Sequence, residues 1–271
     1  MLTSRAWLVP HLPTLVLDEH RRHRTPMLEA LAREAGRVSE ERPDVVAALS
    51  ARWVSPGPFQ VDIGRRHRTL TDYPGFGVEL RYDCQGHPAI ARALVDAGAR
   101  AGVRVGPAQR GVDSGVTVPL HFLMRSLRLP VVPLSIAARP ATECRTWGGV
   151  VRRVLEARPE KVALVVGGLL SHDAHAWTFQ REVPEARAFD EHALQALAAG
   201  AWDDLRIRDP KVVERAHPEA ELRHLDFLRG FLLSNVQGEV LCYEAGPGVG
   251  GALAAFETGA VPAPPATHPP S

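Results

Sequence analysis

The stretch DVVAALSARWVSPGPF (residues 44–59) shows what kind of fold the chain has. Its residues 45–49 form a short, uninterrupted apolar run, which is typical of a parallel strand buried on both faces. The run stops at Ser50-Ala51-Arg52-Trp53. Because open α/β sheets place their ligands at the carboxyl ends of such strands, Arg52 stands where a functional residue is expected.

Similar apolar runs alternate with amphipathic stretches along the rest of the chain. Strands separated by helices predict α/β architecture: one domain with a central, mainly parallel mixed sheet that is flanked by helices on both faces. We expect this domain to cover residues 1–260, with loop insertions near 55–85 and 172–190, and the Pro-rich segment 261–271 to be a disordered tail. The expected strands are 6–9, 45–49, 131–136, 162–166 and 239–243, and the expected helices are 26–37, 88–101, 116–127, 146–157 and 219–233.

The composition limits the classes of partner. The chain has 271 residues, and its 45% of hydrophobic residues are enough for a packed core. Lys and Arg (32) balance Asp and Glu (31), so nucleic acid and membrane surfaces are not expected partners, and no segment has the roughly 20 apolar residues of a membrane span. Cys84, Cys144 and Cys242 are widely separated, which favours reduced thiols and a cytoplasmic location.

Polar residues that could carry chemistry lie near the ends of several predicted strands. His11 follows the first strand, His172 follows the Gly-Gly turn after residues 162–166, and Glu239 begins a late strand. Two histidines and one carboxylate are the set that holds non-haem Fe(II) with open coordination positions. A single histidine after a strand is more often a capping or surface residue, so residue types alone give a metal-site hypothesis and no more.

The order of several motifs resembles the class III extradiol ring-cleaving dioxygenases, which include protocatechuate 4,5-dioxygenase and 2-aminophenol 1,6-dioxygenase. These motifs are VPHLP (9–13), SARW (50–53), DSGVTVPL (113–120) and VVGGLLSH (165–172), and the resemblance covers about residues 5–256. The segment RHRTLTDYPGFGVELRYDC (66–84) is most similar to the subunit of 2-aminophenol 1,6-dioxygenase whose active site has decayed. The resemblance implies an oxidoreductase with one α/β domain and with Fe(II) as the family cofactor.

The resemblance also implies roles for individual residues. His11 matches an iron ligand, and Glu239 is the best match for the carboxylate ligand, with Glu244 as the alternative. His172 matches the acid/base residue, and His175 lies three residues further on as a second catalytic candidate.

Two positions depart from the pattern of the active members. Where they carry the second iron ligand, in a Ser-x-His-Trp phrase, this chain has Arg52, whose guanidinium stays protonated and offers no lone pair. Where they often carry Asp-His-Gly, this chain has Ser114, which with His121 is expected to line the substrate pocket. We expect Arg52 to pair with a nearby carboxylate, namely Glu239, and iron to be absent or weakly bound.

These departures favour a noncatalytic subunit with a structural role. Such a subunit would pack against a homologous active dioxygenase, or against itself, through exposed loops at 53–59 and 71–77.

Two alternatives remain open. The chain could be an active Fe(II) dioxygenase for a catechol or 2-aminophenol type substrate, with the missing ligand supplied by His67, His121 or His175. It could also be a metal-free binder of a small aromatic or carboxylate ligand, with Arg52 pairing the carboxylate through two hydrogen bonds.

Overall fold

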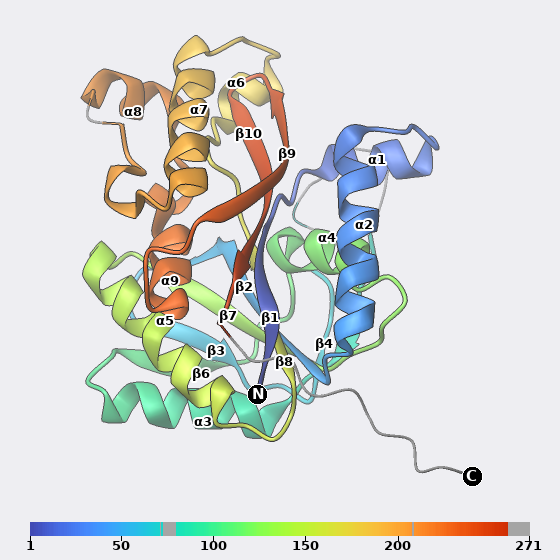
Figure 1. The fold of residues 1–271 in the computed structure, drawn as a ribbon, viewed down its shortest axis with the longest axis vertical. Helices are drawn as coiled ribbons and strands as arrows, with labels where there is room; N and C mark the ends of the chain where they lie inside the picture. The colour runs from blue at the N-terminus through green and yellow to red at the C-terminus, as the bar shows by residue number, and fades with distance from the viewer. Residues whose placement is uncertain (71, 73–79, 208, 260–271) are drawn as a thin grey trace.

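The computed structural model describes residues 1–70, 72, 80–207 and 209–259, and most of them surround one eight-stranded sheet (Figure 1). A two-stranded sheet joins β4 (Arg66–His67) to β5 (Cys84–Gln85). From edge to edge, the strands of the large sheet are β6 (Val105–Ala108), β3 (Phe59–Asp62), β7 (Val131–Ala137), β2 (Val45–Ser55), β8 (Val162–Gly167), β1 (Leu2–Val9), β10 (Val249–Glu257) and β9 (Gly238–Gly246).

The centre of the sheet is parallel, as the sequence predicted. Strands β7, β2, β8 and β1 run in the same direction, whereas at one edge β10 runs against β1 and β9 runs against β10. Each of the five predicted strands lies within an observed strand. Because the central strands are parallel, their carboxyl ends meet at one rim of the sheet.

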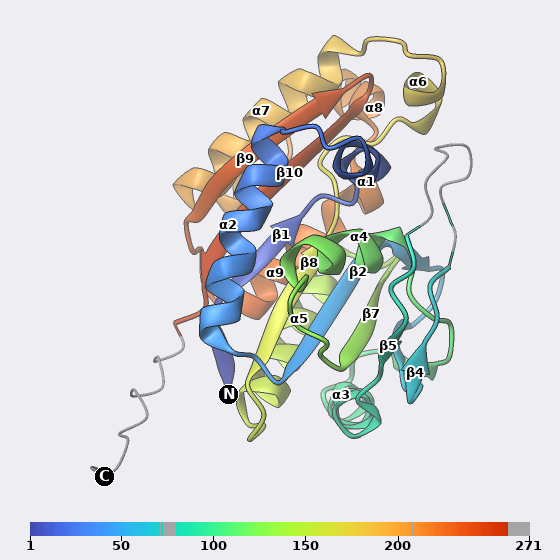
Figure 2. The ribbon, with the colours of Figure 1, turned by 90° about the vertical axis from the view of Figure 1, so that its right-hand side faces the viewer.

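Helices cover both faces of the sheet: in Figure 2 one helical layer lies in front of the central strands and the other lies behind them. One hydrophobic cluster lies under α1 (Pro13–His20), α2 (Pro26–Glu41) and α4 (Ser114–Leu123). The other lies under α3 (Pro88–Arg100), α5 (Ala141–Glu156), α7 (Pro184–Ala199), α8 (Pro210–Ala216) and α9 (Arg223–Leu232). Two shorter elements, α6 (Ala174–Thr178) and the 3-10 helix η1 (Trp202–Asp204), lie in the connections between these longer elements.

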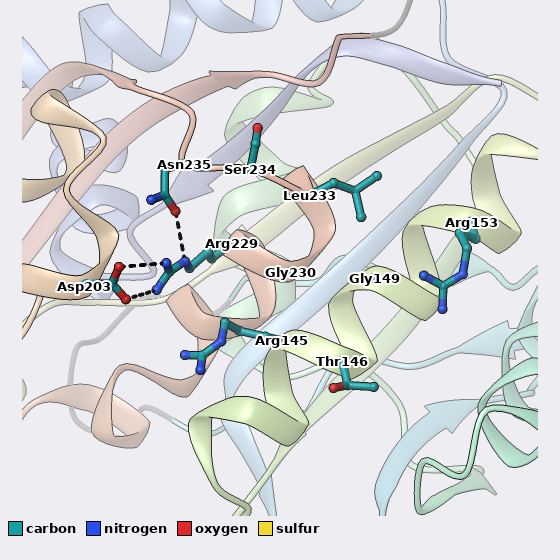
Figure 3. A pocket seen from close by; sticks show the side chains of 10 residues that line it. All are labelled: Arg145, Thr146, Gly149, Arg153, Asp203, Arg229, Gly230, Leu233, Ser234 and Asn235. Carbon is teal, nitrogen blue, oxygen red and sulfur yellow. Dashed lines mark hydrogen bonds and ion pairs between the residues drawn. The ribbon is translucent and has the colours of Figure 1, made fainter.

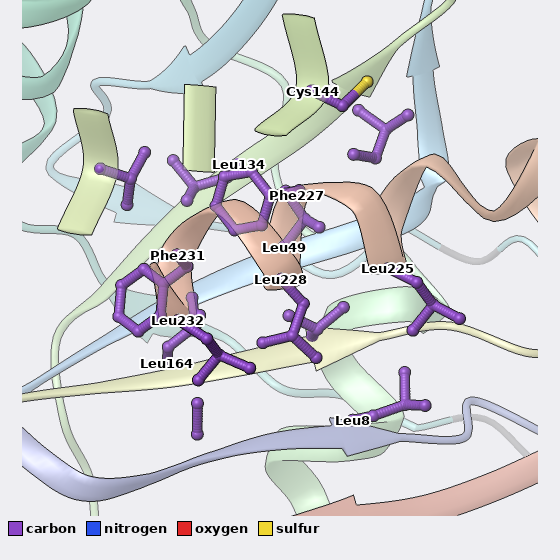
Figure 4. Packing of buried hydrophobic residues seen from close by; sticks show 14 of the residues in the cluster. Leu8, Leu49, Leu134, Cys144, Leu164, Leu225, Phe227, Leu228, Phe231 and Leu232 are labelled. Carbon is purple, nitrogen blue, oxygen red and sulfur yellow. The ribbon is translucent and has the colours of Figure 1, made fainter. Parts of the chain in front are cut away.

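Helix α9 packs tightly against the sheet and against α5. In Figure 4, Phe227 and Phe231 of this helix lie among leucines from the central strands, including Leu49 and Leu164. The two helices approach closely because α5 has a glycine at the contact: a Cβ atom on Gly148 would stand 2.0 Å from the carbonyl oxygen of Phe227. This packing fixes α9, whose first turns face the rim where the parallel strands end.

The start of the predicted helix 219–233 differs from the expectation. Residues Glu219–Leu222 form a separate 3-10 turn, η2, because Ala220, Glu221 and Leu222 adopt left-handed backbone angles (φ 48°, 53° and 58°). The α-helix begins only at Arg223. This turn allows Glu219 to point away from the helix axis and toward the rim of the sheet.

The prediction that loop 53–59 exposes an aromatic surface to a partner was wrong. Strand β2 extends to Ser55, and both Trp53 and Phe59 are buried. The Trp53 indole N–H donates to Gln60, and the Arg110 guanidinium lies 5.2 Å from its ring centroid. Buried aromatic residues of this kind stabilise the chain itself, so they are not available to a partner.

The two predicted loop insertions contain short strands and helices. The expected insertion near 55–85 contains β3, β4 and β5, and the one near 172–190 contains α6 and the first part of α7. The predicted tail 261–271 and most of loop 71–77 lie outside the described residues. The three cysteines are free, and none of the helices in the described ranges is long and apolar enough to cross a membrane.

Candidate active site at the strand ends

The candidate site lies where β1 and β8 end, beside the point at which β2 stops pairing with β8. Val9 of β1 and Ser50 of β2 both pair with Gly167, the last residue of β8. His11 follows the first of these strands and His172 follows the third. Arg52 lies in the irregular part of the second strand, between the pairs that Ser50 and Val54 form with β7. The parallel register therefore brings three predicted site residues to one rim.

His11 is held by a carboxylate that the sequence interpretation missed. Its Nε2 atom lies 2.9 and 3.0 Å from the two carboxylate oxygens of Glu219, and both side chains are buried. The same carboxylate accepts a hydrogen bond of 2.6 Å from the backbone N–H of Leu169. Burial alone would raise the pKa of Glu219, but the neighbouring rings, His11 above all, outweigh it and lower this pKa to about 2.

His172 joins this pair from the loop after β8. Its ring centroid is 6.3 Å from that of His11, and its Nδ1 atom is 3.7 Å from Glu219 Oε1. Burial lowers the pKa of His172, the carboxylate opposes this effect, and the charges of His11 and Arg52 lower the pKa further. The neutral ring is therefore favoured, which is the form that can accept a proton.

Arg52 does not pair with Glu239, so that prediction was wrong. Its Nε atom donates to Asp72 at 3.2 Å, and Asp72 also accepts from both the hydroxyl (2.7 Å) and the backbone N–H (3.1 Å) of Ser114. The physical reason is proximity: Asp72 lies next to Ser114 at the start of α4, whereas Glu239 lies elsewhere in the sheet. The two positions that depart from the active pattern, Arg52 and Ser114, thus share one carboxylate.

Glu239 does not join the histidines. It lies on the edge strand β9, half exposed, and pairs with Arg5 in the first part of β1 at 2.8 Å. Its alternative, Glu244, has its pKa raised by burial and by the charge of Asp18, so no histidine stabilises its charged form. Glu219 occupies the place that these two residues were expected to fill, because turn η2 carries it to the rim.

Two other predicted histidines also lie apart from the His11 and Glu219 pair. His175 lies on α6, and its ring centroid is 4.6 Å from that of Phe179. His121 lies on α4 and contacts Glu19 of α1. Their sequence neighbours suggested a shared pocket, but each side chain is occupied by a local contact instead.

His224 is a second site residue that the sequence interpretation missed. It lies in the first turn of α9, fully buried, and neither ring nitrogen has a hydrogen-bond partner among the described residues. Gly168 lies against it, since a Cβ atom there would stand 2.6 Å from the ring. Burial lowers the pKa of His224 to about 4, opposed by Glu219 and reinforced by His11. The one available signal was the polar run HPEAELRH (217–224) at a helix start, which is typical of ordinary capping residues.

We expect His224→Leu to flatten the acid dependence of stability. The folded-state pKa of His224 lies below its ordinary value of 6.5, so its contribution is complete above pH 6.5 and is lost as the pH falls toward 4. This loss amounts to roughly 3 kcal/mol in the natural chain. Urea unfolding at pH 8, 6, 5 and 4 measures it, and Glu219 acts in the same direction only below its ordinary value of 4.5.

At pH 8 the leucine variant should be as stable as the natural chain or more so, because it removes two buried nitrogens that lack partners in the described part of the chain. The exposed His20 at the end of α1 gives the matched control, and His20→Leu should leave the pH dependence unchanged. Equal acid dependence in the natural chain and His224→Leu would show that His224 is not buried as a neutral ring.

Iron binding of the kind that the resemblance implies requires two histidines and one carboxylate as ligands. The residues at this rim do not supply these three ligands together. His11 and Glu219 are suitable donors, but their donor atoms face each other. Arg52, which the motif resemblance matches to the remaining ligand, has no lone pair to offer. Across residues 1–70, 72, 80–207 and 209–259, no three His, Cys, Asp or Glu side chains are grouped so that they could hold a metal ion.

Comparison with known proteins shows that the chain is similar to several dioxygenases. The chain is 24% identical over 219 residues to 4,5-DOPA dioxygenase extradiol of Beta vulgaris, an alignment that spans 77% of this chain and 79% of the relative. It is 20% identical over 245 residues to 3,4-dihydroxyphenylacetate 2,3-dioxygenase of Escherichia coli, which spans 83% and 88%. Dioxygenase tasH of Hapsidospora irregularis is 28% identical over 198 residues, spanning 68% and 60%.

The fold has a solved counterpart as well. The crystal structure of the uncharacterized protein JW3007 from Escherichia coli K12 superposes with a TM-score of 0.68 at 16% identity, covering 93% of this chain and 99% of that one. The family model described as the catalytic LigB subunit of aromatic ring-opening dioxygenase matches residues 5–256. The chain therefore belongs to this family of aromatic ring-opening dioxygenases, the class III extradiol enzymes that its motifs resemble.

Proposed function

We propose that this chain is a subunit of an extradiol aromatic ring-cleaving dioxygenase, with a degenerate iron site and a structural role. The observation that carries the proposal is the contact of Arg52 and Ser114 with one carboxylate, Asp72. In the family resemblance both positions belong to histidines of the active site. Here they form a polar network of their own, which has no need of a metal.

The electrostatics of the rim support this proposal. The Arg52 guanidinium remains charged at every physiological pH, and it lies close enough to lower the pKa of His172. A divalent cation bound by His11 and Glu219 would be repelled by that charge. It would also have to separate the existing contact between these two side chains. Both effects weaken metal binding relative to a site with a neutral imidazole at position 52.

The partner in this proposal is a homologous, active dioxygenase subunit, and a second copy of this chain is the alternative. Its substrate would be of the catechol or 2-aminophenol type. The catechol type is supported by a relative named for 3,4-dihydroxyphenylacetate, and the 2-aminophenol type rests on the motif resemblance. Val54, near the end of β2, and Phe179, which follows α6, are exposed apolar side chains that a partner could cover. They replace the aromatic residues of loop 53–59 in this role.

Co-expression with an active family member from the same organism tests the proposal. The chain alone, reconstituted anaerobically with Fe(II), should show no cleavage of protocatechuate, catechol or 2-aminophenol in an absorbance assay. Together with the active member it should elute as one hetero-oligomer in size-exclusion chromatography with light scattering. Stable interfaces bury about 1,200–2,000 Å², so such an assembly should survive chromatography.

Matched variants make this test specific. Phe179→Ser should weaken co-elution, whereas Leu233→Ser, which changes another exposed apolar residue, should leave it intact. Ring cleavage by the isolated chain would instead support an active dioxygenase. A chain that stays monomeric beside the active member and leaves its activity unchanged would contradict the subunit role.

A further inference from the structure

A groove beside the end of β3 is lined by arginines. It lies between the turn that carries β4, the start of α3 and the loop at 109–111, and its volume is about 470 Å³. Five arginines line it: Arg65, Arg66, Arg68, Arg92 and Arg110. Since the whole chain has a net charge of only +1, this groove concentrates positive charge that is balanced elsewhere.

Most of these arginines lack an acidic partner. Arg110 pairs with Asp113, but within the described part of the chain Arg65, Arg66, Arg68 and Arg92 form no ion pair. All four are exposed. Guanidinium groups that have no carboxylate partner and face a hollow are available to an anion from solution.

Asp62 also lines this groove, and its carboxylate anchors the backbone of the loops around it. Its carboxylate accepts the backbone N–H groups of Gly64 (2.8 Å), Arg110 (2.8 Å) and Gly111 (2.9 Å). Burial raises the pKa of Asp62, but hydrogen bonds from His67 and these backbone groups outweigh it and lower the pKa to about 2. The carboxylate is therefore satisfied internally, and it ties together the two loops that carry four of the arginines.

Close backbone contacts fix the same loops. Gly111 has a φ of +99°, and a Cβ atom there would stand 2.5 Å from the carbonyl oxygen of Arg68. A Cβ atom on Gly86 would stand 2.0 Å from the carbonyl oxygen of Gly64. Neither position tolerates a larger residue. The arginines thus project from a backbone whose geometry is set before any ligand arrives, which lowers the entropy cost of binding.

In a second groove lined by arginines, most of the arginines form ion pairs with acidic residues. It lies between α5 and α9, and Figure 3 shows that Arg229 reaches Asp203 and Asn235 there. The two ion-pair distances to Asp203 are 2.7 and 3.1 Å, and Arg145 pairs with Asp226 at 3.3 Å. Of the arginines that line this groove, Arg153 alone has no ion pair among the described residues. The second groove therefore offers a matched control for the first.

We propose that the groove of Arg65, Arg66, Arg68 and Arg92 binds a small oxyanion that carries two or more phosphate or carboxylate groups. The guanidinium fork pairs with either group through parallel hydrogen bonds. A groove of this volume fits a small molecule rather than a folded segment of a protein. Several convergent charges favour a multivalent anion over a single carboxylate, and such binding weakens as salt screens the charges.

Isothermal titration calorimetry of the full chain at low salt, with pyrophosphate and with citrate as probes, tests the proposal and separates the two chemistries. At least one probe should bind, and R65Q/R66Q/R68Q should weaken its binding at least about 10-fold. R145Q/R153Q/R229Q, which removes three arginines from the second groove, should change it less than about 2-fold. Circular dichroism checks that each variant is folded.

Single variants keep the test valid if either triple variant is unstable. R92Q should weaken binding by about 3-fold, and R153Q should leave it unchanged. Absence of binding by the natural chain to both probes would overturn the proposal, as would equal losses in the two triple variants. Binding of a poly-glutamate peptide without binding of either small anion would also overturn it, in favour of an acidic protein partner.

Discussion

Replacing Glu219 with alanine should lower the free energy of unfolding by about 3 kcal/mol at pH 7. The carboxylate is buried, contacts His11 with both oxygens and accepts the backbone N–H of Leu169. Removing one partner of a buried, hydrogen-bonded pair leaves the other groups without partners, which typically costs about 3–5 kcal/mol for ion pairs. We place the expected loss at the lower end of this range. Urea denaturation followed by circular dichroism measures it.

Glu239 provides the control for this experiment, because the sequence pointed to it and the structure places it on the surface. Glu239→Ala removes an exposed ion pair with Arg5 and should change the free energy of unfolding by less than about 1 kcal/mol. Similar losses in the two variants would contradict the position of Glu219 in the site. A larger loss for Glu239→Ala would return Glu239 to the role that the sequence suggested.

Replacing Arg52 with histidine should raise the affinity for Fe(II) at least about 100-fold. The change removes a permanent positive charge and adds an imidazole, the ligand type that completes a set of two histidines and one carboxylate. Asp72 would lose its ion pair but keep both hydrogen bonds from Ser114. Anaerobic titration with Fe(II) in competition with a coloured chelator measures the affinity.

Arg153→His is the matched control for that titration. Arg153 lines the groove between α5 and α9, away from the strand-end rim. The same substitution there should leave the Fe(II) affinity unchanged, which excludes a general effect of one added histidine. If Arg52→His binds iron no better than the natural chain, position 52 is not the position of a lost ligand.

The sequence predicted the scaffold well because local patterns determine it. Apolar runs such as 45–49 and 162–166 are uninterrupted, so they identify buried parallel strands without further information. Once these strands are adjacent, the residues that follow them must converge. This convergence explains why the amino-acid sequence alone places His11, Arg52 and His172 at one rim.

The carboxylate could not be placed in the same way. Glu239 was predicted as the carboxylate ligand because it lies at the start of a strand. However, β9 is an edge strand, and Glu239 pairs with Arg5 away from the rim. Glu219 reaches His11 only because turn η2 adopts left-handed angles at three residues that are not glycine. Such residues rarely adopt this conformation, so no local pattern predicts it.

The predicted aromatic surface was wrong for a related reason. Trp53 and Phe59 look like loop residues next to Pro and Gly, yet β2 continues through Ser55 and β3 begins at Phe59. Their burial depends on neighbours such as Arg110 and Trp147, which are far away in the sequence. The carboxylate partner of Arg52 is a further example, because Asp72 is 20 residues away along the chain and also contacts Ser114 at the start of α4.

Anomalous diffraction at the iron edge, from crystals of the natural chain soaked anaerobically in Fe(II), shows whether the strand-end rim holds iron. The degenerate-site account predicts no iron peak beside His11 and Glu219, with Arg52 still paired to Asp72. It also predicts a peak at that position in crystals of Arg52→His treated in the same way. A fully occupied iron in the natural chain, bound by His11, Glu219 and a third side chain, would contradict the account.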